Sequence, residues 1–183
     1  MHIETKAIHA GLHAQKETSD VVPPIHKSTI FEHSKEGHQK GDLTYTRDAN
    51  PNRLQLEHLL AELEEGESCA AFSSGVAAAT AVLQARKPGD HVLMPDDVYT
   101  GNRQLINNVM KPWGLEADFI SMTDIFDIKK AIQKNTVLIW VETPSNPLLN
   151  ITDIKAVCDL AHQNDAIVCV DNTWPSPVNQ MPL

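Results

Sequence analysis

Apolar positions follow two alternating patterns from residue 53 onwards. The first is helical: leucines recur every three or four positions between Asn50-Pro51-Asn52 and Gly66, so they share one face of a helix. The second is a short continuous apolar run, which indicates a buried strand. Such runs occupy residues 69–72, 91–94, 115–120, 136–141 and 166–170. Further helices are predicted at 76–85, 102–110, 124–133 and 152–163, with Asp124 and either Thr152 or Asp153 as caps.

This alternation predicts an α/β fold. Continuous apolar strands are typical of sheets buried on both faces, and helices between successive strands provide the crossovers that parallel strands need. We therefore expect a mostly parallel sheet sandwiched by helices over residues 53–183. No internal repeat or low-complexity tract interrupts the pattern.

Residues 1–52 differ from the rest of the chain. They are rich in His, Gly, Pro and charged residues and show no long periodic apolar stretch. Val21-Val22-Pro23-Pro24-Ile25 is predicted to be extended, because each proline fixes its own φ and biases the preceding residue away from helix. We interpret residues 1–52 as an N-terminal arm that packs on something larger, such as a second subunit.

Composition excludes several classes of partner. The chain of 183 residues carries a net charge of −9, which gives it no electrostatic attraction to nucleic acid or anionic lipid. No signal peptide or membrane-spanning stretch is evident, and the three cysteines show no CxxC spacing, so we expect a cytoplasmic protein with reduced thiols. His9 and His13 are four residues apart but lack a persuasive third ligand, so no metal site is predicted.

The junctions after the predicted strands carry the candidate chemistry. In open α/β sheets, ligands bind beyond the carboxyl ends of the strands. Ser74, Gly75 and Val76 open a helix there, and free amides at a helix N-terminus bind phosphate. An ordinary serine-capped turn explains the same residues. The segment matches neither the Walker nor the GxGxxG pattern, which argues against nucleoside triphosphates and dinucleotides.

Two further junction residues suit a flat, cationic ring. Asp171 follows a buried strand, where a carboxylate needs a partner, and a pyridinium nitrogen would serve. Tyr99 could stack on such a ring. Each residue also has a plain structural explanation, since a strand-end aspartate can cap a turn and a tyrosine can pack beneath a loop.

Five segments between residues 45 and 177, in order and spacing, closely resemble motifs of the Cys/Met-metabolism family of pyridoxal 5′-phosphate (PLP) enzymes, and two earlier segments resemble the N-terminal arm of that family. This family includes cystathionine γ-synthase, the cystathionine γ- and β-lyases and methionine γ-lyase. The segments are IHAGLH (8–13), VVPPIHKSTIF (21–31), YTRDANPN (45–52), SSGVAAATA (73–81), DDVYTGN (96–102), ETPSNPLL (142–149) and VDNTWPSP (170–177). The resemblance implies the PLP-dependent transferase fold of type I, like that of aspartate aminotransferase.

The resemblance also implies roles for individual residues. Ser74, Gly75 and Val76 would cradle the PLP phosphate, and Asp171 would pair with the ring nitrogen. Tyr99 would stack on the pyridine ring and assist proton transfer, and it is the catalytic candidate. Asn146 would lie near the 3′-oxygen, and Thr173 near the ring.

In this family the arm completes a neighbouring site. Tyr45 and Arg47 would reach the phosphate bound by a second subunit, so the resemblance implies a homodimer, commonly within a homotetramer. A guanidinium can hold phosphate in a bidentate, charge-assisted geometry. Arg103 falls one position earlier after Tyr99 than the arginine many family members use near the substrate, and it is left unassigned.

The implied reaction is trans-sulfuration chemistry on a sulfur amino acid or an activated homoserine, through an external aldimine and Cα deprotonation. The family's Schiff-base lysine lies in a Ser-x-Thr-Lys motif, and no lysine of this chain stands in that context. We therefore expect an incomplete PLP-binding domain over residues 53–183 that is inactive alone. The alternative is a non-catalytic fragment or assembly module of the same fold.

Overall fold

The computed structural model describes residues 2–12, 19–37 and 43–183, and two compact units divide the chain. The first comprises Met1–Ala71 with Leu183, and the second comprises Phe72–Pro182. The boundary predicted after residue 52 marks the end of an arm expected to contact a second subunit. It stays a prediction, because the structure contains one subunit. His13, part of the IHAGLH motif, lies outside the described residues. No helix in the described ranges is long and apolar enough to cross a membrane.

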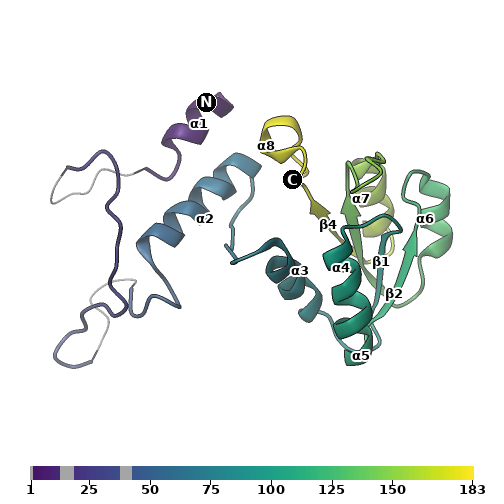
Figure 1. Cartoon of the computed structure of the whole chain (residues 1–183), viewed down its shortest axis with the longest axis horizontal. Helices are drawn as coiled ribbons and strands as arrows, with labels where there is room; N and C mark the ends of the chain where they lie inside the picture. The colour runs from purple at the N-terminus through teal and green to yellow at the C-terminus, as the bar shows by residue number, and fades with distance from the viewer. Residues whose placement is uncertain (1, 13–18, 38–42) are drawn as a thin grey trace. The chain divides into compact units, whose positions relative to one another are not determined.

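The first unit contains two helices, α1 (Ile3–His9) and α2 (Pro51–Glu64) (Figure 1). The predicted helix is present but starts two residues earlier than expected, at Pro51, because Asn50 caps it by accepting a hydrogen bond from the amide of Asn52 at 3.0 Å. No residue of α2 is fully buried, so its leucine face lacks deep cover within the described structure.

The segment before α2 is fixed by one arginine. The Arg53 guanidinium donates to the carbonyl oxygens of Thr46, Arg47 and Asp48. Tyr45 forms an isolated antiparallel bridge with Ile30. Arg53 therefore holds the turn that presents Tyr45 and Arg47.

The second unit is a four-stranded parallel sheet in the order β2-β1-β3-β4. The strands are β1 (His91–Pro95), β2 (Glu116–Ile120), β3 (Thr136–Glu142) and β4 (Ile167–Asp171). β3 pairs with β1 on one side and β4 on the other, and it is nearly continuously buried. The predicted α/β sheet is confirmed over these four strands.

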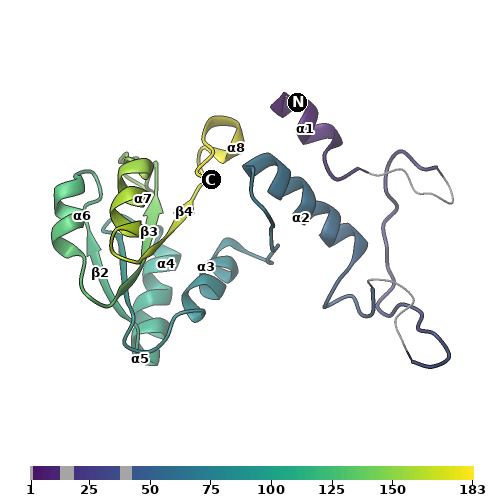
Figure 2. The ribbon, with the colours of Figure 1, turned by 180° about the vertical axis from the view of Figure 1, so that it is seen from behind.

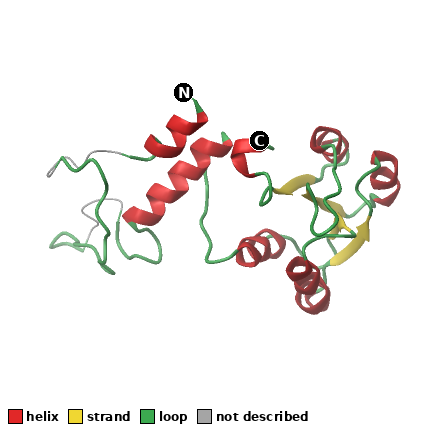
Figure 3. Cartoon of the chain, turned by 45° about the horizontal axis from the view of Figure 1, so that its top comes forward, coloured by secondary structure: helices red, strands yellow, loops and turns green. Residues whose placement is uncertain are grey.

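Helices cover both faces of this sheet, as Figure 3 shows. The helices of the unit are α3 (Gly75–Gln84), α4 (Thr100–Leu105), the π-helical turn η1 (Ile106–Met110), α5 (Lys111–Trp113), α6 (Ile125–Ala131), α7 (Ile154–His162) and α8 (Ser176–Asn179). Seen from opposite sides, α6 and α7 lie next to each other (Figure 1, Figure 2). The caps predicted at Asp124 and Asp153 are present, because each side chain accepts an amide hydrogen bond from the first turn.

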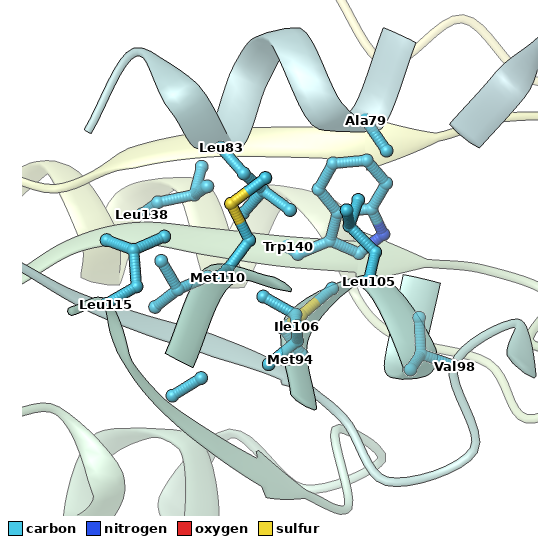
Figure 4. Packing of buried hydrophobic residues seen from close by; sticks show 12 residues of the cluster. Ala79, Leu83, Met94, Val98, Leu105, Ile106, Met110, Leu115, Leu138 and Trp140 are labelled. Atoms are coloured by element: carbon cyan, nitrogen blue, oxygen red, sulfur yellow. The ribbon is translucent and has the colours of Figure 1, made fainter. Parts of the chain in front are cut away.

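Alternate strand residues divide the core into two clusters. Val92, Met94, Leu138 and Trp140 belong to the cluster with α3, α4 and η1, which Figure 4 shows around Leu83 and Met110. Leu93, Ile139 and Val141 belong to the cluster with α6 and α7. Successive residues of a strand point to opposite faces of the sheet, and here both faces are covered by apolar clusters. Consecutive positions within these strands are therefore apolar, and the sequence shows continuous apolar runs instead of alternation.

Two predicted elements need correction. Residues 69–72 form no strand: the Ala71 amide donates to the Glu57 carboxylate at 2.9 Å, and Phe72 is 49% exposed. A strand needs a paired neighbour, and none lies beside this run in the described structure. The helix predicted at 102–110 runs from Thr100 to Trp113 through the π-helical turn, and Gly114, with a φ of 113°, ends it.

A buried histidine makes the stability of this fold depend on pH. His91 is 1% exposed, and its Nδ1 lies 2.8 Å from the Thr136 hydroxyl. Burial lowers the pKa of His91 below its ordinary value of 6.5, and the Asp118 carboxylate opposes this shift. The unfolded chain therefore takes up a proton at a higher pH than the folded one.

We predict that the free energy of unfolding falls as the pH falls from about 6.5 through the folded pKa of His91. His91 contributes at most about 1.4 kcal/mol per pH unit to this slope. His91→Gln removes that contribution. Denaturant unfolding of both proteins at a series of pH values measures the difference. Identical slopes for wild type and His91→Gln would contradict the prediction.

Candidate cofactor site

One cavity of about 520 Å³ opens at the carboxyl ends of the strands of the second unit. It is lined from four places that are distant in sequence: the start of α3, the segment from β1 into α4, the end of β3 with its following loop, and the end of β4. The lining residues are Ser74, Gly75, Val76, Tyr99, Asn102, Glu142, Asn146, Asp171, Thr173 and Trp174. Seven of the nine residues predicted from the sequence are therefore brought together.

The α3 end of the cavity suits an anion. Ser74 caps the helix, because its Oγ accepts a hydrogen bond from the Ala77 amide at 3.1 Å. The remaining first-turn amides of this ten-residue helix carry the positive end of its dipole. A Cβ built on Gly75 would meet no atom within 4 Å, so the backbone there faces open space. A phosphate fits at this end.

The strand ends supply the opposite charge. Asp171 and Glu142 are partners in the β3–β4 register, so their carboxyl groups follow adjacent strands. The Asp171 Oδ1 accepts hydrogen bonds from the Thr173 hydroxyl at 2.5 Å and from the Thr173 amide at 3.2 Å. Thr173 thus holds Asp171 in place. The lining residues include these two carboxylates and no cationic side chain.

Tyr99 lines the same cavity and is the residue that precedes α4. Its side chain is 46% exposed, which leaves a ring face available. A Cβ on Gly101 would lie 2.5 Å from the ring carbon Cε1, so only glycine lets the ring lie across the start of α4. Tyr99 is therefore placed by local packing and is free to contact a ligand.

Asn102 supports the fit of a polar ligand. It is 3% exposed, it lines the cavity, and its Oδ1 has no hydrogen-bond partner in the described structure. A buried carbonyl oxygen without a hydrogen-bond partner is unfavourable by about 1–3 kcal/mol. A ligand or water that bonds to this group would relieve the cost.

Glu142, Asn102 and Trp174 are the lining residues that the sequence interpretation did not assign. Glu142 carried the same signal as Asp171, since both are acidic and end a buried strand. Trp174 shares its junction with Thr173. Asn102 gave no signal of its own, because its position depends on α4 starting at Thr100.

Three other residues do not join this cavity. Tyr45 and Arg47 belong to the first unit, where the Arg47 guanidinium carbon lies 5.0 Å from the centroid of the Tyr45 ring. Arg103 donates to the Asp96 carbonyl, and its guanidinium carbon lies 4.2 Å from the Phe119 ring centroid. Arg103 is thus engaged in packing, which agrees with leaving it unassigned.

The cysteines and histidines form no second reactive centre in the part of the chain that the structure describes. All three cysteines are free thiols, and burial raises the pKa of Cys169 to about 11, so this thiol stays protonated near neutral pH. No three His, Cys, Asp or Glu side chains gather to hold a metal ion among the described residues.

Comparison with known proteins identifies the family. Residues 4–183 match the family described as Cys/Met metabolism PLP-dependent enzyme. The chain belongs to this family. The family's cofactor is pyridoxal phosphate, and the fold of the chain is shared with solved members of the family.

The chain spans about half the length of the relatives it matches. It is 43% identical to cystathionine gamma-synthase of Mycobacterium leprae over 99% of this chain and 47% of that protein. It is 41% identical to cystathionine gamma-lyase of Bacillus subtilis over 100% of this chain and 48% of that protein. The solved structure of metB from Corynebacterium glutamicum superposes with a TM-score of 0.97 at 39% identity, over 100% of this chain and 48% of that one.

The cap at Ser74 gives a direct test of the local structure. We predict that Ser74→Ala lowers the free energy of unfolding by about 1 kcal/mol, because Ala77 loses its amide partner, whereas Ser74→Gly lowers it by only a few tenths. Urea unfolding of the three proteins measures both values. An alanine variant as stable as the wild type would show that the cap bond is absent.

Proposed function

We propose that this chain forms the cofactor-binding part of a PLP-dependent enzyme of trans-sulfuration, of the cystathionine γ-synthase or cystathionine β/γ-lyase type. The observation that carries the proposal is the two-ended cavity, with helix amides at α3 and the Asp171 carboxylate at β4. A phosphate at one end and a pyridinium nitrogen at the other match the two charges of PLP. The family match supplies the identity of that ligand.

Six of the lining residues have a definite task in this proposal. Gly75 and Val76 offer amides to the phosphate, and Asp171 keeps the ring nitrogen protonated. Tyr99 would stack on the ring and assist proton transfer. Asn146 and Thr173 lie beside the ring. When bound, PLP supplies the electron sink that stabilises negative charge at Cα of an amino acid.

A second copy of the chain would complete the phosphate end. The lining residues offer no cation to balance a phosphate, although they include two carboxylates. Arg47, beside Tyr45 on the turn held by Arg53, is a suitable guanidinium from a partner subunit. A homodimer, within a homotetramer, therefore forms part of the proposal.

The charge at position 171 tests the proposal. The probe is pyridoxamine 5′-phosphate, which has the ring and phosphate of PLP but no aldehyde to react with lysines. We expect Asp171→Asn to weaken its binding about tenfold or more, because a charge-assisted hydrogen bond contributes about 1.5–3 kcal/mol. Equilibrium titration followed by fluorescence measures the dissociation constants.

The matched control is Asp165→Asn, which changes the net charge equally at an exposed residue whose φ of 55° asparagine tolerates. It should bind the probe as the wild type does. The same affinity for all three proteins, or no binding by the wild type, would argue against the proposed site.

No lysine is among the lining residues of the cavity. We therefore expect PLP followed by borohydride to label several lysines of this chain weakly, with no single dominant adduct. Peptide mapping by mass spectrometry gives the distribution. A single lysine carrying most of the label would contradict this part of the proposal.

A non-catalytic assembly module is the second candidate, favoured by the same lack of a lysine in the cavity. The two candidates share the fold and the cofactor pocket, but only the enzyme would convert a substrate. The coding sequence that follows Leu183 separates them, since a Ser-x-Thr-Lys motif there supports the enzyme and a stop codon supports the module.

A further inference from the structure

Glu142 is a buried carboxylate in the cavity wall to which the proposed function gives no task. It ends β3, is 3% exposed, and lines the cavity beside Asp171. Its two oxygens bind two different segments. Oε2 accepts a hydrogen bond from the Tyr99 amide at 2.9 Å, and Oε1 accepts one from the Asn146 amide at 3.0 Å.

These two amides belong to the segments that carry the proposed ring contacts. Tyr99 ends the segment that leads from β1 into α4, and Asn146 lies in the loop after β3. Both amides donate to the side chain of the same strand residue, so the Glu142 carboxylate is their shared fixed point. Because β3 is one of the two central strands and is paired on both sides, Glu142 is held by a strand fixed within the sheet.

A cation near Glu142 and Asp171 would stabilise their charged forms. Burial raises the pKa of Glu142; the Tyr99 and Asn146 amides oppose this shift, while the Asp171 and Asp97 carboxylates add to it. Two adjacent carboxyl groups in one cavity repel each other unless a cation lies near them. A protonated pyridine ring in the cavity would be such a cation.

We propose that Glu142 is a positioning residue, whose two oxygens set the places of Tyr99 and Asn146 around the cofactor ring. This inference rests on the proposed function, because it assigns Glu142 a role toward the ligand of that site. Glu142 does not touch the reacting atoms in this account. It acts through the backbone of the two residues that do contact the ring.

Glu142→Gln tests the inference with little change in shape. Glutamine keeps one acceptor oxygen but turns an amino group toward the other amide, so either Tyr99 or Asn146 loses its partner. We expect the dissociation constant of pyridoxamine 5′-phosphate to rise about tenfold or more. We also expect a fall in the circular dichroism that the protein induces in each bound ligand molecule. An achiral ring acquires dichroism only when it is held in a fixed orientation within the asymmetric surroundings of the protein.

The matched control is Thr143→Val. Thr143 is the next residue, is equally buried and accepts a hydrogen bond from the Thr152 amide at 3.0 Å, but it does not line the cavity. The Thr143→Val variant therefore loses one buried acceptor at the start of the loop that follows β3. We expect its stability to fall while the dichroism per bound ligand stays at the wild-type value.

The outcomes separate the inference from the proposed function. If the wild type binds the probe and Glu142→Gln matches it in affinity and in dichroism, the positioning role is wrong and the proposed site stands. If Glu142→Gln loses affinity only as much as Thr143→Val and keeps the wild-type dichroism, Glu142 is merely structural and the inference also fails. If the wild type does not bind, both fail.

A further measurement covers the case in which Glu142→Gln does not fold. Native-state hydrogen exchange of the wild type then reports on the two amides directly. Protection of the Tyr99 and Asn146 amides before ligand is added supports the inference. Rapid exchange of both amides, comparable to that of exposed loops, would overturn it.

Discussion

The pairing of β3 with β1 on one side and β4 on the other is the constraint on which the site depends. Parallel pairing places the ends of these strands at the same edge of the sheet, so residues far apart in sequence become neighbours. The register sets Glu142 beside Asp171. The two core clusters, one on each face, hold the strands in that register, because a slip by one residue would exchange the faces of every apolar side chain.

The cavity at this edge has opposite electrical characters at its two ends. The α3 amides attract an anion, and the strand-end carboxylates attract a cation. A ligand with a phosphate and a protonated ring satisfies both ends together, whereas a simple anion or cation would satisfy only one. The charges of the cavity are compatible with pyridoxal phosphate, the cofactor of the family to which the chain belongs.

The sequence predicted the parts of the fold that depend on local chemistry. Four of the five apolar runs are strands, and the caps at Asp124 and Asp153 follow from side-chain oxygens next to free amides. Residues 69–72 failed because a strand depends on a neighbour that a local pattern cannot reveal. Glu142 carried the same strand-end signal as Asp171, but its hydrogen bond to the Tyr99 amide joins residues that only the tertiary fold brings together.

A crystal structure of this chain with pyridoxamine 5′-phosphate tests the central claim most directly. The account predicts the phosphate against the amides of Gly75 and Val76, the ring beside Tyr99, and the ring nitrogen facing Asp171. A ligand found in the reverse orientation, or outside this cavity, would contradict it.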